Sequence, residues 1–111
     1  MNIENIKLKD SAVMEVINPL TGKFEGATIE IFNRYSDEYR SAKVVKDFTS
    51  ISNNILDLCI AITKEIKGFK DGDRELTSSK EDIKYLYDNC PFLLDDIDKF
   101  FSENSNFFLN R

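Results

Sequence analysis

The segment from Ser36 to Lys67 constrains the fold most, because its apolar residues follow one helical face for longer than a small domain is wide. Unbroken, this helix would be about 48 Å long, at about 1.5 Å per residue. A chain of 111 residues forms a domain with a radius of gyration of about 13 Å. The apolar stripe, spaced by three and four residues, consists of Val44, Phe48, Ile51, Ile55, Leu58 and Ile62.

Two outcomes are therefore open for residues 36–67. Ser and Asn side chains between residues 50 and 54 favour a break there, because they compete for backbone hydrogen bonds. Alternatively, the helix stays whole and its stripe forms the seam of a homo-oligomer, with the six stripe residues as candidate contacts. Ser36 is a suitable N-terminal cap, and Gly68 is expected to end the helix.

Upstream, two segments alternate apolar and polar residues, as half-buried strands do. In the first, Met14 and Val16 share one face, whereas Val13, Glu15 and Ile17 share the other. The second is TIEIF, residues 28–32, and the connection NPLTGKFEG is rich in turn residues. We predict a β-hairpin over about residues 13–33 and a flexible arm over residues 1–11. Because a lone hairpin is marginal in water, it must pack against helices.

The last third of the chain predicts two short helices. Ser78 and Glu81 have the spacing of a capping box before a helix over residues 79–90. Pro91 stops that helix, and a second one follows over residues 92–104 with Leu93 and Ile97 on its buried face. We therefore expect residues 12–111 to form a single α+β domain, in which the hairpin packs against three or four helices.

The chain is unusually apolar near its last residue. Chain ends are normally polar and frayed, so these aromatic residues either close the core or bind a partner. Adjacent side chains rarely point the same way, so one of the final pair of Phe residues could stay available. The candidate partner-binding residues are Phe100, Phe101, Phe107, Phe108 and Leu109.

The charge distribution and hydropathy of the chain argue against two classes of binding partner, nucleic acids and membranes. Residues 1–70 carry ten acidic and ten basic side chains, whereas residues 71–111 carry ten acidic and five basic ones. The acidic last third disfavours nucleic acid, whose phosphates require Lys and Arg. No apolar run is long enough to span a membrane, and the first residues lack a signal-peptide core. We expect an intracellular protein without a nucleic-acid or membrane partner.

The residues of catalytic and metal sites are scarce. The chain has no His, which is the commonest general base and a common metal ligand. Cys59 and Cys90 occupy apolar positions of helical patterns and are interpreted as buried small side chains. No phosphate-binding glycine loop is present. We predict neither catalysis nor a cofactor.

Two stretches together resemble the tail assembly chaperones of long-tailed bacteriophages and prophages. NPLTGKFEGATIEIFNRYSDEYR resembles the family's opening, and residues 66–109 resemble its closing segment. Phe69 stands where the family pattern has Trp, and the likeness covers roughly residues 13–109. The matching residues are Asn18, Pro19, Thr21, Gly22, Ser36, Glu38, Tyr39, Gly68, Phe69, Asp71, Gly72, Leu76, Ser79, Pro91, Leu93, Ile97, Phe100, Asn106 and Phe107.

The resemblance implies a function in the cytoplasm of a bacterial host. Such chaperones bind the long, helical tape measure protein, keep it in solution and help recruit tail tube protein around it. In many relatives a ribosomal frameshift adds a C-terminal extension to some copies. Two alternatives remain: a structural component of the head–tail connector or tail, and a small host adaptor or regulator with no link to phage.

Overall fold

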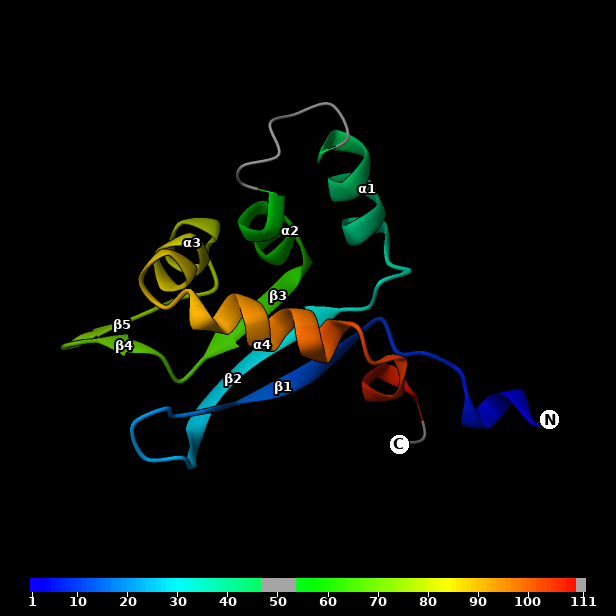
Figure 1. Cartoon of the computed structure of the whole chain (residues 1–111), viewed down its shortest axis with the longest axis horizontal. Coiled ribbons are helices and arrows are strands. Elements are labelled where there is room, and N and C mark those ends of the chain that lie inside the picture. The colour runs from blue at the N-terminus through cyan, green and yellow to red at the C-terminus, as the bar shows by residue number, and fades with distance from the viewer. Residues whose placement is uncertain (47–53, 110–111) are drawn as a thin grey trace.

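The computed structural model describes residues 1–46 and 54–109, and for residues 43–46 and 54 it describes the backbone alone. Figure 1 shows a sheet with helices packed against it. The strands are β1 (Ser11–Ile17), β2 (Phe24–Phe32), β3 (Thr63–Lys67), β4 (Lys70–Asp71) and β5 (Arg74–Glu75). The α-helices are α1 (Asp37–Lys46), α2 (Asn54–Ile62), α3 (Lys80–Asn89) and α4 (Phe92–Phe101), and the 3₁₀ helices are η1 (Ile3–Asn5) and η3 (Asn104–Phe107).

The predicted hairpin and the α+β class are confirmed. Within the described residues, β1, β2 and β3 form one antiparallel sheet with β2 in the centre. The alternation in β1 is also confirmed, because Met14 and Val16 are buried whereas Val13 and Ile17 are exposed. Met14 pairs with Ile29 of β2, so the inward side chains of the two strands lie side by side.

The expectation that the helix continues to about Lys67 is wrong, because α2 ends at Ile62 and β3 begins at Thr63. Ile62 and Ile66 are both buried, and their spacing of four residues resembles a helical stripe. β3 instead pairs with the second edge of β2, where Glu30 lies opposite Glu65. A third strand stabilises a hairpin that is marginal alone, and the β-branched residues of this segment suit a strand.

Gly68, which the sequence suggested as a helix end, follows β3. Its φ is +80°, and a Cβ there would lie 2.7 Å from the backbone oxygen of Gly26. The close approach of these two backbones requires glycine at this position. Gly68 therefore does end an element of secondary structure, but that element is the strand β3 and not a helix.

A single unbroken helix over residues 36–67 is also wrong, because α1 and α2 pack against each other (Figure 1). The predicted break near residues 50–54 lies largely outside the described residues, as residues 47–53 separate the two helices. The stripe residues Phe48 and Ile51, and the side chain of Val44, also lie outside the described part.

The C-terminal helices form close to their predicted positions. The cap of α3 is Ser79, whose side chain accepts from the Asp82 N–H at 3.1 Å, so the cap lies one residue after the predicted Ser78. The Asp82 carboxylate binds Thr77 and Arg74. The hydroxyl of Ser78 instead binds Ile66 of β3. α4 ends at Phe101, and η3 covers Asn104–Phe107 in place of a longer last helix.

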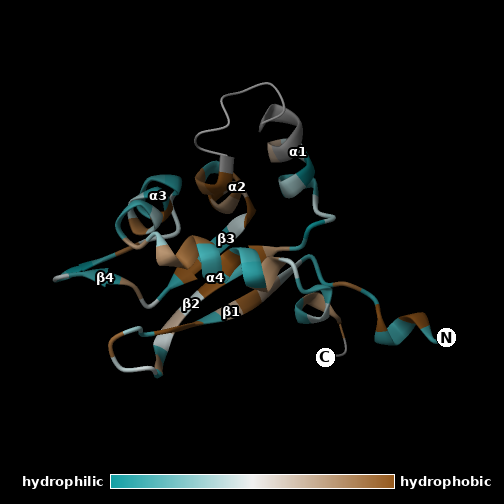
Figure 2. Cartoon of the chain, in the orientation of Figure 1, coloured by the Kyte–Doolittle hydropathy of each residue, from teal (hydrophilic) through white to brown (hydrophobic). Residues whose placement is uncertain are grey.

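The core lies between one face of the sheet and the helices, where the apolar residues of Figure 2 gather. A membrane-spanning helix is not found within the described part of the chain. The largest side chains that are completely buried are Tyr87, Phe107, Ile29, Ile31, Leu93 and Ile97.

The two ends of the chain pair with each other. Leu8 and Phe108 form an isolated antiparallel bridge. The Lys9 N–H donates to the Phe107 carbonyl at 2.7 Å, and the Leu109 N–H donates to the Lys7 carbonyl at 2.7 Å. Residues 7–9 of the predicted arm are therefore bound to the C-terminal segment, while the flexibility of the arm stays a prediction.

Candidate functional site

The structure separates the predicted partner-binding aromatics. Phe107 is 1% exposed, and its ring packs edge-on against Phe100 with centroids 5.6 Å apart. Phe101 lies against Tyr39 of α1, with centroids 5.0 Å apart. Phe108 is half-buried and Leu109 is 53% exposed. Phe107 thus belongs to the core, and Leu109 is the member of this set that is most accessible.

The described residues of the predicted oligomer seam contribute unequally to the fold. Ile62 is buried, Leu58 is half-buried and Ile55 is 65% exposed. All three line a small cavity of about 110 Å³ beside Ile97 and Phe101 of α4. This part of the stripe therefore packs mainly within the chain, and Ile55 is left at its margin.

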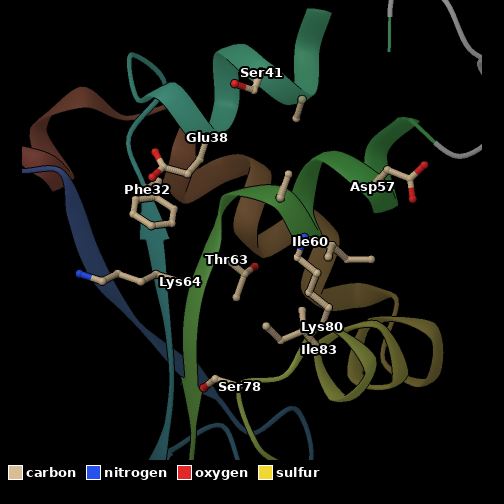
Figure 3. A pocket seen from close by; sticks show the side chains of 12 residues that line it. Phe32, Glu38, Ser41, Asp57, Ile60, Thr63, Lys64, Ser78, Lys80 and Ile83 are labelled. Atoms are coloured by element: carbon tan, nitrogen blue, oxygen red, sulfur yellow. The ribbon is translucent and has the colours of Figure 1, made fainter. Parts of the chain in front are cut away.

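A larger cleft, which the sequence reasoning missed, opens between α1, α2, the start of β3 and the start of α3 (Figure 3). Its volume is about 650 Å³. The apolar part of its lining consists of Phe32, Ala42, Ile60, Ala61 and Ile83. The polar part consists of Glu38, Ser41, Asp57, Thr63, Lys64, Ser78 and Lys80.

Among the described residues that line this cleft, acidic and basic side chains are equal in number. Glu38 and Asp57 come from α1 and α2, whereas Lys64 and Lys80 come from β3 and α3. The Lys64 ammonium lies 5.9 Å from the centre of the Phe32 ring and 3.5 Å from a Glu30 carboxylate oxygen. The cleft therefore combines an apolar lining with charges of both signs, a combination that suits an amphipathic helix.

A buried hydrogen-bond network lies behind the cleft. The Thr63 hydroxyl donates to the Cys59 carbonyl at 2.6 Å and lies 2.6 Å from the Tyr87 hydroxyl. Because Thr63 has one hydroxyl proton, Tyr87 is the donor in the second bond. Burial raises the pKa of Tyr87, and the hydrogen bond to Thr63 opposes this shift. The network fixes the junction between α2 and β3 against α3.

The cysteines differ in their environment. Burial, with a smaller contribution from the Asp98 charge, raises the pKa of the Cys59 thiol to about 12. Cys90 is half-buried at the end of α3. The interpretation of Cys59 as a buried small side chain is confirmed, and its thiol is a poor nucleophile because it stays protonated.

An ion pair between Arg74 and Asp82 lies outside the cleft. The Thr77 N–H, the Arg74 guanidinium at 2.9 Å and the Thr77 hydroxyl together lower the pKa of Asp82 to about 2. This arrangement fastens the β4–β5 hairpin to the first turn of α3. In the part of the chain that the structure describes, no three His, Cys, Asp or Glu residues lie close enough together to hold a metal ion.

Comparison of the chain with family models, with curated proteins and with solved structures finds no match. The likeness to the tail assembly chaperones therefore stays a prediction that rests on the residues quoted above. The cleft is the structural feature on which a binding function can be argued.

Proposed function

We propose that the chain is a non-catalytic tail assembly chaperone of a phage or prophage, and that it binds the tape measure protein in the cytoplasm of the bacterial host. The cleft between α1, α2 and α3 is the observation that carries this proposal. Recruitment of the tail tube protein would follow on the same complex. The resemblance of the sequence is the reason for proposing this client, and the cleft supports the proposal because its lining suits a bound helix.

The chemistry of the cleft suits a helical client. An amphipathic helix buries apolar side chains at every third or fourth residue and keeps charged side chains at the margin. Phe32 of β2 and Ile60 of α2 are both half-buried and offer apolar surface, and the buried side chain of Ile83 of α3 closes the cleft behind them. Lys64 and Lys80 can pair with acidic residues of the client, and Glu38 with basic ones. Contacts of this kind are weak singly, which suits a chaperone that must later release its client.

A matched pair of substitutions tests the role of the cleft. Ser41 lines it, and Ser41→Arg would place a long charged side chain inside without removing a core residue. Ser102, exposed at the end of α4 and outside the cleft, gives the control Ser102→Arg. The readout is the soluble fraction of the tape measure protein of the same phage or prophage when the two proteins are expressed together.

The wild-type chain and Ser102→Arg should keep the tape measure protein in solution, whereas Ser41→Arg should not. If the wild-type chain has no effect, the chaperone function is wrong. If Ser41→Arg acts as well as the wild type, the function stands and its assignment to the cleft is wrong. Mass spectrometry of purified virions separates the structural alternative, because a tail component would remain in mature particles at stoichiometric amounts.

A further inference from the structure

β1 and β3 are the edge strands of the sheet, and the outward backbone groups of the two strands differ in their hydrogen bonding. At β3, the Ser78 hydroxyl accepts from the Ile66 N–H at 2.9 Å and donates to the Ile66 carbonyl at 3.1 Å. One side chain thus satisfies both outward backbone groups of Ile66. An edge covered in this way cannot pair with another strand at that position.

The edge of β1 has no such cover. The Asn33 N–H donates to the Asp10 carbonyl at 2.9 Å, and the same register pairs Ala12 with Ile31 and Met14 with Ile29. Hydrogen-bonded and non-bonded pairs alternate in antiparallel strands, so Val13 and Glu15 direct their N–H and C=O groups away from β2. Within the described residues, no hydrogen bond reaches these outward groups.

A groove of about 380 Å³ runs along this edge. Met14 lies on the inner face of β1 and Ile17 on the outer face, yet both line the groove, so it follows the strand edge itself. Its other wall comes from α4 and the segment that follows it, with Phe100 as the apolar member. Figure 1 shows α4 running beside this part of the sheet. A groove between a free strand edge and a helix can accept an extended peptide as an added strand.

The charges of the groove indicate which peptide fits. Glu15, Asp96 and Glu103 line it with a single cation, Lys99, so its described lining carries an excess of negative charge. Ile17, which is 48% exposed, and the half-buried Phe100 supply apolar contacts. The irregular register between Glu15 and Ile17 limits regular pairing to the first part of β1. The occupant is therefore short, extended, basic and apolar at alternate positions.

We propose that the edge of β1 and the groove beside α4 form a second binding site, which takes a short basic–apolar segment of a partner protein as an added β-strand. This site is separate from the cleft between α1, α2 and α3. The inference does not rest on the tape measure proposal, and it holds for any partner that presents such a segment.

The probe is a capped heptapeptide that alternates lysine and valine, with an otherwise identical peptide in which glutamate replaces lysine. Backbone amide shifts of the full chain are followed by NMR during titration. The lysine peptide should shift Val13, Glu15 and residues of α4, slow amide exchange at Val13 and Glu15, and bind more tightly than the glutamate peptide. The amide shifts of the cleft residues should stay unchanged.

Two variants at one position separate backbone pairing from side-chain contact. Val13→Pro removes an outward N–H that β2 does not use, and proline is tolerated on the free side of an edge strand. Val13→Ala keeps the N–H and removes the side chain. Val13→Pro should weaken binding about tenfold, as expected for the loss of one backbone hydrogen bond. Val13→Ala keeps this bond and should change the affinity less than about threefold.

Charge reversal on α4 supplies a variant that does not touch β1. Asp96→Lys combined with Glu103→Lys changes two exposed side chains and should reverse the preference toward the glutamate peptide. The proposal is overturned if neither peptide shifts β1, if the two Val13 variants bind equally, or if charge reversal leaves the preference unchanged. Dilution-dependent shifts of β1 without peptide would assign the edge to a second copy of the chain and would also overturn it.

Discussion

The hydroxyl oxygens of Thr63 and Tyr87 lie 2.6 Å apart in the core, although one residue opens β3 and the other lies in α3. Thr63 also donates to the Cys59 carbonyl of α2. The consecutive elements α2 and β3 are therefore tied to α3, which is distant in sequence, at a single side chain. This contact holds the inner side of the cleft in place.

Thr63→Val should lower the free energy of unfolding by about 1–3 kcal/mol, because it leaves the buried Tyr87 hydroxyl without its acceptor. Urea unfolding followed by circular dichroism measures this loss. Adding Tyr87→Phe removes the unsatisfied hydroxyl, so the double variant should be less unstable than the sum of the two single variants. Simple additivity of the two losses would show that the hydroxyls do not interact.

The buried thiol predicts a dependence of stability on alkaline pH. Burial raises the pKa of Cys59 from 9.0 to about 12, so the folded state holds a proton that the unfolded state releases. This contribution is complete below pH 9.0 and is lost as the pH rises toward about 12. Tyr87, whose pKa burial also raises, acts in the same direction. Cys59→Ala should therefore show a shallower decline of stability with pH, and parallel curves would contradict the assignment.

Leu86→Asp should prevent folding, because Leu86 is 5% exposed and a carboxylate at this place would have no partner. Lys84, which is exposed on the same helix, gives the control Lys84→Asp. This change removes an exposed ion pair with Asp88, so it should keep the far-UV circular dichroism spectrum and cost about 1 kcal/mol or less. A folded Leu86→Asp protein with native thermal stability would show that this face of α3 is not in the core.

Substitutions of the apolar residues near the C-terminus should mainly lower the free energy of unfolding. Phe107→Ala is expected to cost about 3–5 kcal/mol because its ring is buried against Phe100. Leu109→Ala should cost less than about 0.5 kcal/mol, as its side chain is half exposed. Deleting residues 107–111 should lower the melting temperature accordingly. If melting is unchanged while binding of the tape measure protein is lost, the tail is a docking element.

The sequence predicted the local elements of the fold well. Alternation in β1 and β2 was legible because one face of each strand is buried and the other faces outward. The serine cap and Pro91 placed α3 and α4 within a few residues, because both signals act on the adjacent backbone.

Features that depend on contacts between residues distant in sequence could not be predicted from local sequence patterns. Ile62 and Ile66 fit a helix by their spacing, and β3 becomes a strand because β2 offers its second edge. The cleft joins Phe32 of β2 to Lys80 of α3, and no local pattern links these residues. The aromatic pair near the C-terminus was correctly singled out, but the sequence did not show that Phe107 would be the buried member. Phe107 packs against Phe100, and its backbone is held by pairing with residues 7–9.

The central claim is that the cleft between α1, α2 and α3 binds a helical segment of the tape measure protein. Hydrogen–deuterium exchange of the chain, alone and in complex with that protein, tests it most directly. The account predicts slower exchange in the complex over residues 38–42, 57–64 and 78–83. Exchange that is unchanged over these residues in a saturated complex, or that slows only outside them, would contradict it.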